Sequence, residues 1–254
     1  MRRTRVIPIL LLHNRGLVKS VKFKNYKYVG DPINAVRIFN EKEVDEICIL
    51  DITATRQKRP PDFEHIAEIV SEAFMPISYG GGVTGLDDAE RLFYNGVEKI
   101  VLNHATVDRT DLIGDIASRY GAQSVMGSID YRKNWLGRQS VYTLNGEVAV
   151  KLSPLQKAVE LRDLGVGEII LNSIDRDGTY SGYDLKTIEE VTRAVGVPVV
   201  ACGGASSVDD FRKAKQAGAS AVAAGSMFVF QRPHNAVLIS YPKPEILKKE
   251  LFTK

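Results

Sequence analysis

The sequence has few cysteines and histidines, which limits the redox and metal chemistry open to it. Its 254 residues include two cysteines, Cys48 and Cys202, each inside an apolar run. We expect buried thiols rather than a disulfide or a zinc site, and therefore a protein of the reducing cytoplasm. The four histidines are dispersed without metal-ligand spacing, so no metal ion and no organic cofactor are expected.

Strong charge and long hydrophobic segments are also missing. The formal net charge is +3 at pH 7, with Lys and Arg scattered along the chain, which argues against a nucleic-acid partner. No apolar run reaches the ~18 residues that a membrane span needs. The apolar run near the N-terminus contains Pro8 and lacks a small-residue cleavage site, so it predicts a buried strand rather than a signal peptide.

An internal repeat is the most informative feature that is present. Residues 75–107 and 197–229 align without a gap at an offset of 122 positions. The pairs at this offset include Pro76 and Pro198, Gly81 and Gly203, Gly96 and Gly218, and Glu46 and Glu168. This regularity indicates a duplication, so the chain is expected to contain two copies of one half.

Eight short apolar runs alternate with amphipathic stretches of helical period. Such runs are typical of parallel strands buried on both faces. The predicted strands are Val6–Leu12, Glu46–Ile52, Pro76–Tyr79, Lys99–Asn103, Ser124–Ile129, Glu168–Ile174, Pro198–Cys202 and Ala221–Ala224. The predicted helices are Ile33–Asn40, Phe63–Ala73, Leu86–Tyr94, Thr110–Tyr120, Leu155–Leu164, Leu185–Val195 and Val208–Ala217. Asp62, Asp184 and Ser207 are the expected N-caps of three of them.

The alternation and the repeat together predict the fold. We expect an α/β protein with a single (β/α)8 TIM barrel over residues 1–254, built from half-barrels at about 1–121 and 122–254. An open doubly wound sheet is the alternative, but it leaves the repeat unexplained. Two long connections, 11–31 and 131–151, follow the first and fifth strands and are expected on the catalytic face, the second as a hairpin turned at Asn145-Gly146.

Glycines at matched strand ends suggest two phosphate sites. Glycine lets backbone N–H groups approach an oxyanion, and the following helix N-terminus adds a favourable dipole. The first half offers Gly81, Gly82 and Asn103, and the second offers Gly178, Gly203, Gly204, Gly225 and Ser226. Tight strand-to-helix turns are the alternative explanation, which the duplication makes weaker.

Carboxylates at strand ends are the candidates for acid/base chemistry, because they project into the barrel mouth. Four aspartates qualify: Asp51, Asp130, Asp175 and Asp177. Asp130 is the strongest, since it ends an apolar strand and opens a long loop. Symmetry predicts a partner at the end of the first strand, where residues 9–12 are not ionisable.

Charges mark the opposite ends of the strands. Four residues precede apolar runs and would ring the bottom opening of the barrel: Arg5, Glu46, Lys99 and Glu168. From these residues alone, two interpretations are possible. The four charges either form a functional gate, or they are solvent-exposed charges at the rim that sum to zero.

The chain resembles the cyclase subunit of imidazole glycerol phosphate synthase along nearly its whole length. The most specific match is the string SIDRDGT-x-SGYD at 173–184, and others are RVIP at 5–8, GDP at 30–32, LDITA at 50–54 and CGGA at 202–205. The resemblance implies a lyase that binds a substrate with two phosphates, through Lys19, Asp51, Asp177 and the glycines. It also implies a glutaminase partner on the bottom face, whose ammonia passes a gate formed by Arg5, Glu46, Lys99 and Glu168.

The sequence departs from this family at the acid/base pair. The fifth-strand aspartate matches Asp130, but the first-strand aspartate is replaced by Leu11, which transfers no proton. Two threonines of the family are replaced by His104 and Asn172. This pattern resembles a branch found in surface-polysaccharide loci, in which the barrel supplies ammonia to a sugar amidotransferase. A functional histidine-pathway cyclase and a non-catalytic activator of the glutaminase are the alternatives.

Overall fold

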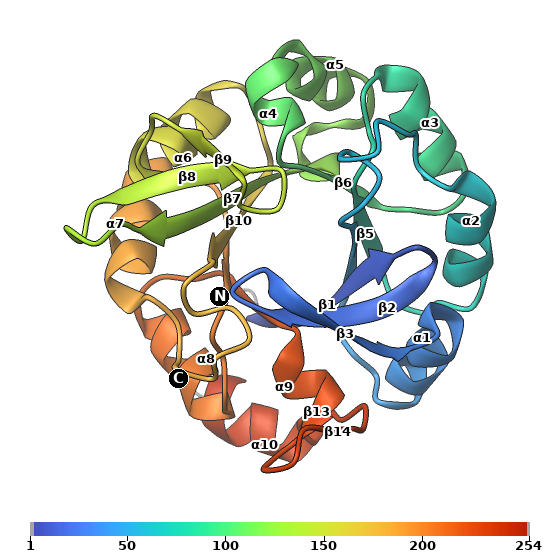
Figure 1. The fold of residues 1–254 in the computed structure, drawn as a ribbon, viewed down its shortest axis with the longest axis vertical. Helices are drawn as coiled ribbons and strands as arrows, with labels where there is room; N and C mark the ends of the chain where they lie inside the picture. The colour runs from blue at the N-terminus through green and yellow to red at the C-terminus, as the bar shows by residue number, and fades with distance from the viewer. Residues whose placement is uncertain (1–2, 253–254) are drawn as a thin grey trace.

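Eight parallel strands close into a barrel in the computed structural model, which describes residues 3–252 (Figure 1). The barrel strands are β1 (Arg5–His13), β4 (Ile47–Asp51), β5 (Ile77–Gly80), β6 (Lys99–Leu102), β7 (Val125–Lys133), β10 (Glu168–Ser173), β11 (Val199–Cys202) and β12 (Ala221–Ala224). Each pairs in parallel with its neighbour, and the β12–β1 and β7–β10 pairings complete the ring. The predicted (β/α)8 barrel is confirmed, and the open sheet is wrong.

A ring of helices covers the outside of the barrel (Figure 1). The seven predicted helices are all present, and each end lies within two residues of its predicted position: α1 (Pro32–Glu41), α2 (Phe63–Ser71), α3 (Leu86–Tyr94), α5 (Asp111–Tyr120), α6 (Pro154–Asp163), α7 (Leu185–Val195) and α8 (Val208–Gln216). Short helices α4 (Ala105–Asp108) and α9 (Ser226–Val229) follow β6 and β12, and α10 (Pro244–Leu247) lies near the C-terminus. None of the helices within residues 3–252 has the length and apolar character of a membrane span.

Two of the three expected N-caps have the predicted hydrogen bonds. Asp62 accepts from the His65 N–H, and Ser207 forms a reciprocal capping box with Asp210. Asp184 begins α7 but makes no cap bond. Its carboxylate instead lies 3.2 Å from Nζ of Lys133, the last residue of β7, whose cation reaches the start of the helix.

Excursions after β1 and β7 cover the carboxyl ends of the strands. The first contains β2 (Gly16–Val21) and β3 (Lys24–Gly30), which the sequence did not predict because most of β3 is exposed and has no hydrophobic alternation. The second contains β8 (Gln139–Thr143) and β9 (Val148–Val150), joined by the expected turn at Asn145-Gly146. A further hairpin, β13 (Phe230–Gln231) with β14 (Ala236–Val237), follows α9.

The core has two layers, as strand alternation in a closed barrel requires. Outward-facing side chains pack against the helices in one large cluster. A smaller cluster fills the inside of the barrel and consists of Ile7, Ile9, Cys48, Val101, Met126, Ile170, Val200, Ala221 and Ala223. The interior is therefore a narrow apolar core between the two ends of the strands.

Substitution of the matched turn glycines should destabilise the protein. A Cβ at Gly81 would lie 2.2 Å from the Asp51 carbonyl oxygen, and one at Gly203 would lie 2.6 Å from that of Ser173, both at positive φ. We expect Gly81→Ala and Gly203→Ala each to lower the free energy of unfolding by about 2 kcal/mol or more. Gly114→Ala, in α5 with open space around it, should raise it by about 0.5–1 kcal/mol. Urea denaturation measures the free energy of unfolding of all three variants. Equal changes at the three sites would contradict the conclusion that Gly81 and Gly203 require glycine.

Candidate functional site

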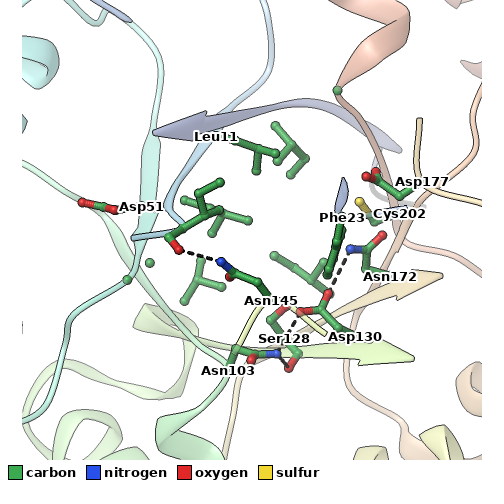
Figure 2. A pocket seen from close by; sticks show the side chains of 18 of the residues that line it. Leu11, Phe23, Asp51, Asn103, Ser128, Asp130, Asn145, Asn172, Asp177 and Cys202 are labelled. Carbon is green, nitrogen blue, oxygen red and sulfur yellow. Dashed lines mark hydrogen bonds between the residues drawn. The ribbon is translucent and has the colours of Figure 1, made fainter. Parts of the chain in front are cut away.

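A cavity opens at the carboxyl ends of the barrel strands, and all eight strands contribute to its wall. Among the inward-facing residues at its base are Ile9, Leu50, Val101, Ser128, Ile170 and Cys202. Figure 2 shows this cavity with polar side chains on the β7 and β10 side and apolar ones toward β1. The position agrees with the catalytic face expected for a barrel of this type.

The predicted anion-binding residues all line this one cavity. Gly81, Gly82 and Asn103 come from the first half, and Gly178, Gly203, Gly204, Gly225 and Ser226 come from the second. β5 and β11, which carry the two Gly-Gly pairs, lie four strands apart in either direction around the closed ladder. The glycine-rich turns therefore face each other across the mouth, although the Gly82 N–H already donates to Thr55 Oγ1 at 3.1 Å.

Asp130 is a buried carboxyl held by two amides. Asn172 Nδ2 donates to its Oδ1 at 2.9 Å, and Asn103 Nδ2 donates to its Oδ2 at 3.2 Å (Figure 2). Burial raises the pKa of Asp130 to about 7, although the Asn172 hydrogen bond opposes this shift. A carboxyl with a pKa near neutrality has the property that a general acid or base needs at that pH.

Lys19 and Asp177 form a second buried pair at the mouth. Burial lowers the pKa of Lys19 to about 8 against the opposing charge of Asp177, and raises that of Asp177 to about 6 against the charge of Lys19. Lys19 Nζ also donates to the carbonyl of Ile9, on the strand that lacks an acid. The ammonium group of Lys19 thus lies beside β1.

The other two aspartates are held by neighbouring groups. Asp51 lines the cavity, but Oδ1 accepts from Thr53 and the Ala54 N–H, and Oδ2 accepts from Arg59 at 2.7 Å. Asp175 lies outside the cavity lining and accepts from the Lys133 N–H at 2.7 Å. Lys133 ends β7, where it pairs with Gln139 on β8. Asp175 therefore holds the β7–β8 hairpin and does not face the site.

The β1 side of the mouth is apolar where symmetry predicts a carboxylate. Ile9, Leu11 and Leu50 form this side of the wall. Phe23, from the turn between β2 and β3, also lines the cavity and lies near Asn172 in Figure 2. Leu11 pairs with Leu50 on β4 in the parallel ladder. The site therefore contains Asp130 from the fifth barrel strand and no ionisable partner from the first.

The turn between β8 and β9 makes contacts across the mouth that the sequence did not predict. Asn145 Nδ2 donates to the Ile52 carbonyl at 2.7 Å, and Glu147 lies 2.9 Å from Arg56. A Cβ at Gly146 would lie 3.3 Å from Phe23. The turn between β8 and β9 thus reaches the loops of the other half, a contact for which the Asn-Gly pair was the only signal in the sequence.

Four charged residues form a closed ring at the opposite end of the barrel. Arg5 contacts both Glu46 and Glu168, and Lys99 Nζ lies 2.9 Å from Glu46 and 3.1 Å from Glu168. The glutamate side chains are nearly inaccessible, with 3% and 6% of their surface exposed. The predicted residues are therefore brought together in a self-neutralising ionic network, in which the glutamates are buried and the side chains of Arg5 and Lys99 remain 30% and 19% exposed.

Residues 3–252 contain no cluster of three or more His, Cys, Asp or Glu side chains able to hold a metal ion. Burial raises the pKa of the Cys48 thiol to about 12 and also raises that of Cys202. The protonated form of each thiol is therefore favoured, which disfavours thiolate chemistry.

The raised pKa of Asp130 has a consequence for stability. The pKa of Asp130 is about 7 in the folded state, above that of an unfolded aspartate. The contribution of Asp130 to the free energy of unfolding is therefore fully present below about pH 4 and is lost as the pH rises through 7. Asp130→Asn should therefore gain roughly 2–3 kcal/mol relative to wild type between about pH 5 and pH 8. Urea denaturation at both pH values tests this, with Asp115→Asn on the exposed surface of α5 as the control. A difference that is constant with pH would contradict it.

Comparisons with known proteins agree with this geometry. The family model described as "Histidine biosynthesis protein" matches residues 5–233. "Putative imidazole glycerol phosphate synthase subunit hisF2" of Pseudomonas aeruginosa is 56% identical, over 95% of this chain and 97% of the relative. "Putative imidazole glycerol phosphate synthase subunit hisF3" of Vibrio vulnificus is 45% identical, over 99% of this chain and 97% of the relative. "Imidazole glycerol phosphate synthase subunit HisF" of Streptomyces griseus is 40% identical, over 89% of this chain and 90% of the relative. The chain therefore belongs to the histidine biosynthesis protein family, as a divergent HisF-type member.

Proposed function

We propose that this chain is the barrel subunit of a glutamine-dependent amidotransferase and supplies ammonia to the amidation of a surface-polysaccharide sugar. In this proposal, a HisH-type glutaminase docks over the ionic ring and releases ammonia there. The ammonia passes through the barrel to the mouth, where a sugar amidotransferase consumes it. The observation that carries the proposal is the combination of a complete ionic ring with an incomplete acid/base pair.

The ionic ring supports ammonia entry. Buried ion pairs are seldom retained for stability alone, because desolvation offsets much of their attraction. All four members are present here and contact one another, at the one end of the barrel from which an axial path could begin. Beyond them, the described side chains inside the barrel form an apolar cluster, which would favour passage of neutral ammonia over the ammonium ion.

The missing acid supports a role other than ring closure. A single general acid or base contributes ~10²–10⁴ to a reaction rate. Leu11 occupies the position that the family's first-strand aspartate would take, and its neighbours in the cavity are apolar. A barrel that only delivers ammonia has no need of this second proton-transfer group.

A cyclase of histidine biosynthesis is the second candidate. The facing glycine turns would suit a substrate with two phosphates, and Asp130 has a pKa of about 7, suited to proton transfer. In this case Asp177 or the Lys19 amine would have to act in place of the missing aspartate. A non-catalytic activator of the glutaminase is the third candidate. The isotope-transfer experiment below distinguishes it from a subunit that delivers ammonia.

The first experiment asks whether ring closure survives. The purified protein is mixed at alkaline pH with excess ammonium and the ribulosyl-aminoimidazole substrate of the family, and imidazole glycerol phosphate is measured. We expect no turnover at ordinary enzyme rates, while Leu11→Asp should raise the rate, by as much as ~10²-fold. Turnover in the wild type that is lost on Asp130→Asn would establish the cyclase and overturn the proposal.

The second experiment follows ammonia through the barrel. The complete complex with glutaminase and sugar amidotransferase receives glutamine labelled with ¹⁵N in its amide, in the presence of unlabelled ammonium. We expect the product to carry mainly the label, and Arg5→Ala or Lys99→Ala to replace most of it with unlabelled nitrogen. Arg119→Ala, which breaks an exposed ion pair with Glu90, is the control. Unlabelled product from the wild type would favour the activator instead.

A further inference from the structure

Exposed apolar side chains are concentrated around the mouth of the barrel. Of twelve large apolar residues left exposed between residues 3 and 252, nine lie in the connections that follow barrel strands. Isolated exposed apolar residues are normal on a protein surface, but a concentration at one end is typical of a contact surface. The nine residues are Val21, Tyr26, Tyr28, Val107, Trp135, Leu136, Val148, Val237 and Leu238.

Two of them stand at the tip of the β7–β8 hairpin. Trp135, the one tryptophan of the chain, is 91% exposed, and Leu136 is 68% exposed. Asn134 holds the turn, because its Oδ1 accepts from the N–H groups of Leu136 at 3.0 Å and Arg138 at 2.9 Å. Figure 1 shows this hairpin reaching outward past α7. The backbone is therefore already ordered around two solvent-exposed apolar side chains, which lowers the entropic cost of binding through them.

A second group lies where two other hairpins meet. Lys27 on β3 donates to the carbonyl of Asn235, in the turn between β13 and β14, at 3.2 Å, and its ammonium group lies over the Phe230 ring. Tyr28 follows Lys27 on β3, Leu238 follows β14, and both side chains are exposed. The exposed apolar residues therefore belong to several connections on the mouth side and not to one loop.

These connections are also basic. Residues 13–30 contain five Lys or Arg, residues 131–146 contain three, and residues 225–238 contain one, while none of the three segments contains Asp or Glu. These nine cations exceed the net charge of the whole chain, which is +3, so the remaining residues sum to a negative charge. Positive charge is therefore concentrated on the mouth side.

Some of this charge is neutralised within the chain, and some is not. Lys133 pairs with Asp184. Lys22, Lys24 and Arg138 are exposed, and none of them forms an ion pair with a residue in the range 3–252. Exposed cations of this kind favour contact with a surface that bears carboxylates, through long-range attraction and complementary pairing.

The position of the mouth indicates which occupant fits this surface. A second copy of the chain would bring cations against cations, which is unfavourable. An anionic bilayer would attract the cations, but it would cover the cavity from which ammonia leaves in the proposed function. A protein with an acidic surface would satisfy the cations and could also bring its own active site to the opening.

We propose that the mouth rim, formed by the β7–β8 tip, the β2–β3 hairpin and the β13–β14 hairpin, is the docking surface for an acidic face of the ammonia-consuming enzyme. Trp135 enters an apolar pocket of this partner, and the unpaired cations of the rim face its carboxylates. The partner then covers the cavity, so ammonia passes from one protein to the other without reaching bulk solvent. This inference rests on the proposed ammonia-transfer function and specifies the surface chemistry of the third subunit.

The test is the binding of the sugar amidotransferase to the whole chain labelled with 5-fluorotryptophan. Because Trp135 is the one tryptophan, ¹⁹F NMR gives a single resonance that reports on the tip alone. We expect a saturable change of this resonance when the amidotransferase is added, and weaker binding as the sodium chloride concentration rises. Vesicles of phosphatidylglycerol should leave the resonance unchanged. A response to the vesicles, or none to the enzyme, would overturn the proposal.

Variants of exposed residues locate the contact. Trp135→Ala, and Lys22→Glu combined with Lys24→Glu, should each weaken binding about tenfold or more by calorimetry. Two matched controls lie at the opposite end of the barrel and should change the affinity little. Tyr94→Ala alters an equally exposed aromatic residue at the end of α3, and Lys42→Glu alters an exposed cation that follows α1. Equal losses in the rim and control variants, or no loss in the rim variants, would overturn the assignment.

The outcome is separable from that of the isotope-transfer experiment. Labelled ammonia transfer that the rim variants leave unchanged would refute the docking surface alone. Docking that the rim variants weaken, without transfer of ammonia, would leave the surface in place and refute the proposed function.

Discussion

Closure of the eight-stranded parallel ladder is the constraint on which the rest of the structure depends. Hydrogen bonds between β7 and β10 complete a ring in which the side chains of every strand alternate between the interior and the helical layer. A cluster of apolar side chains fills the inside of the ring between its two ends. Among residues 3–252, charged side chains gather at both ends of this cluster.

The two ends use charge in different ways. At the N-terminal ends of the strands, four charges face one another and cancel in a buried network. At the carboxyl ends, burial shifts the pKa values of Asp130, Asp177 and Lys19 toward neutrality, and the three groups do not cancel. The first arrangement favours a fixed structure, whereas the second favours proton transfer and binding of a small charged ligand.

The loops above the mouth join the two halves of the repeat. The turn between β8 and β9 belongs to the second half, yet it bonds to Ile52 and Arg56 in the first and packs near Phe23. Both excursions contain an antiparallel strand pair, but the contacts between them are not symmetric. The mouth is accordingly polar toward β7 and β10 and apolar toward β1, which is the asymmetry that the single acid Asp130 already implies.

The sequence by itself determined the barrel, most of its helices and the residues that gather at its two ends. Apolar runs, helical periods, caps such as Ser207 and the offset repeat depend on neighbours along the chain, which a sequence displays directly. It also supplied Asp130, the glycine turns and the absence of an acid at Leu11. Only the tertiary structure decided which groups remain free to act. Arg59 engages Asp51, and the hairpin after β7 engages Asp175 and Asp184, while Asn172 keeps an unpaired oxygen. Those outcomes depend on hydrogen bonds and burial between residues far apart in the chain, and no local pattern encodes them.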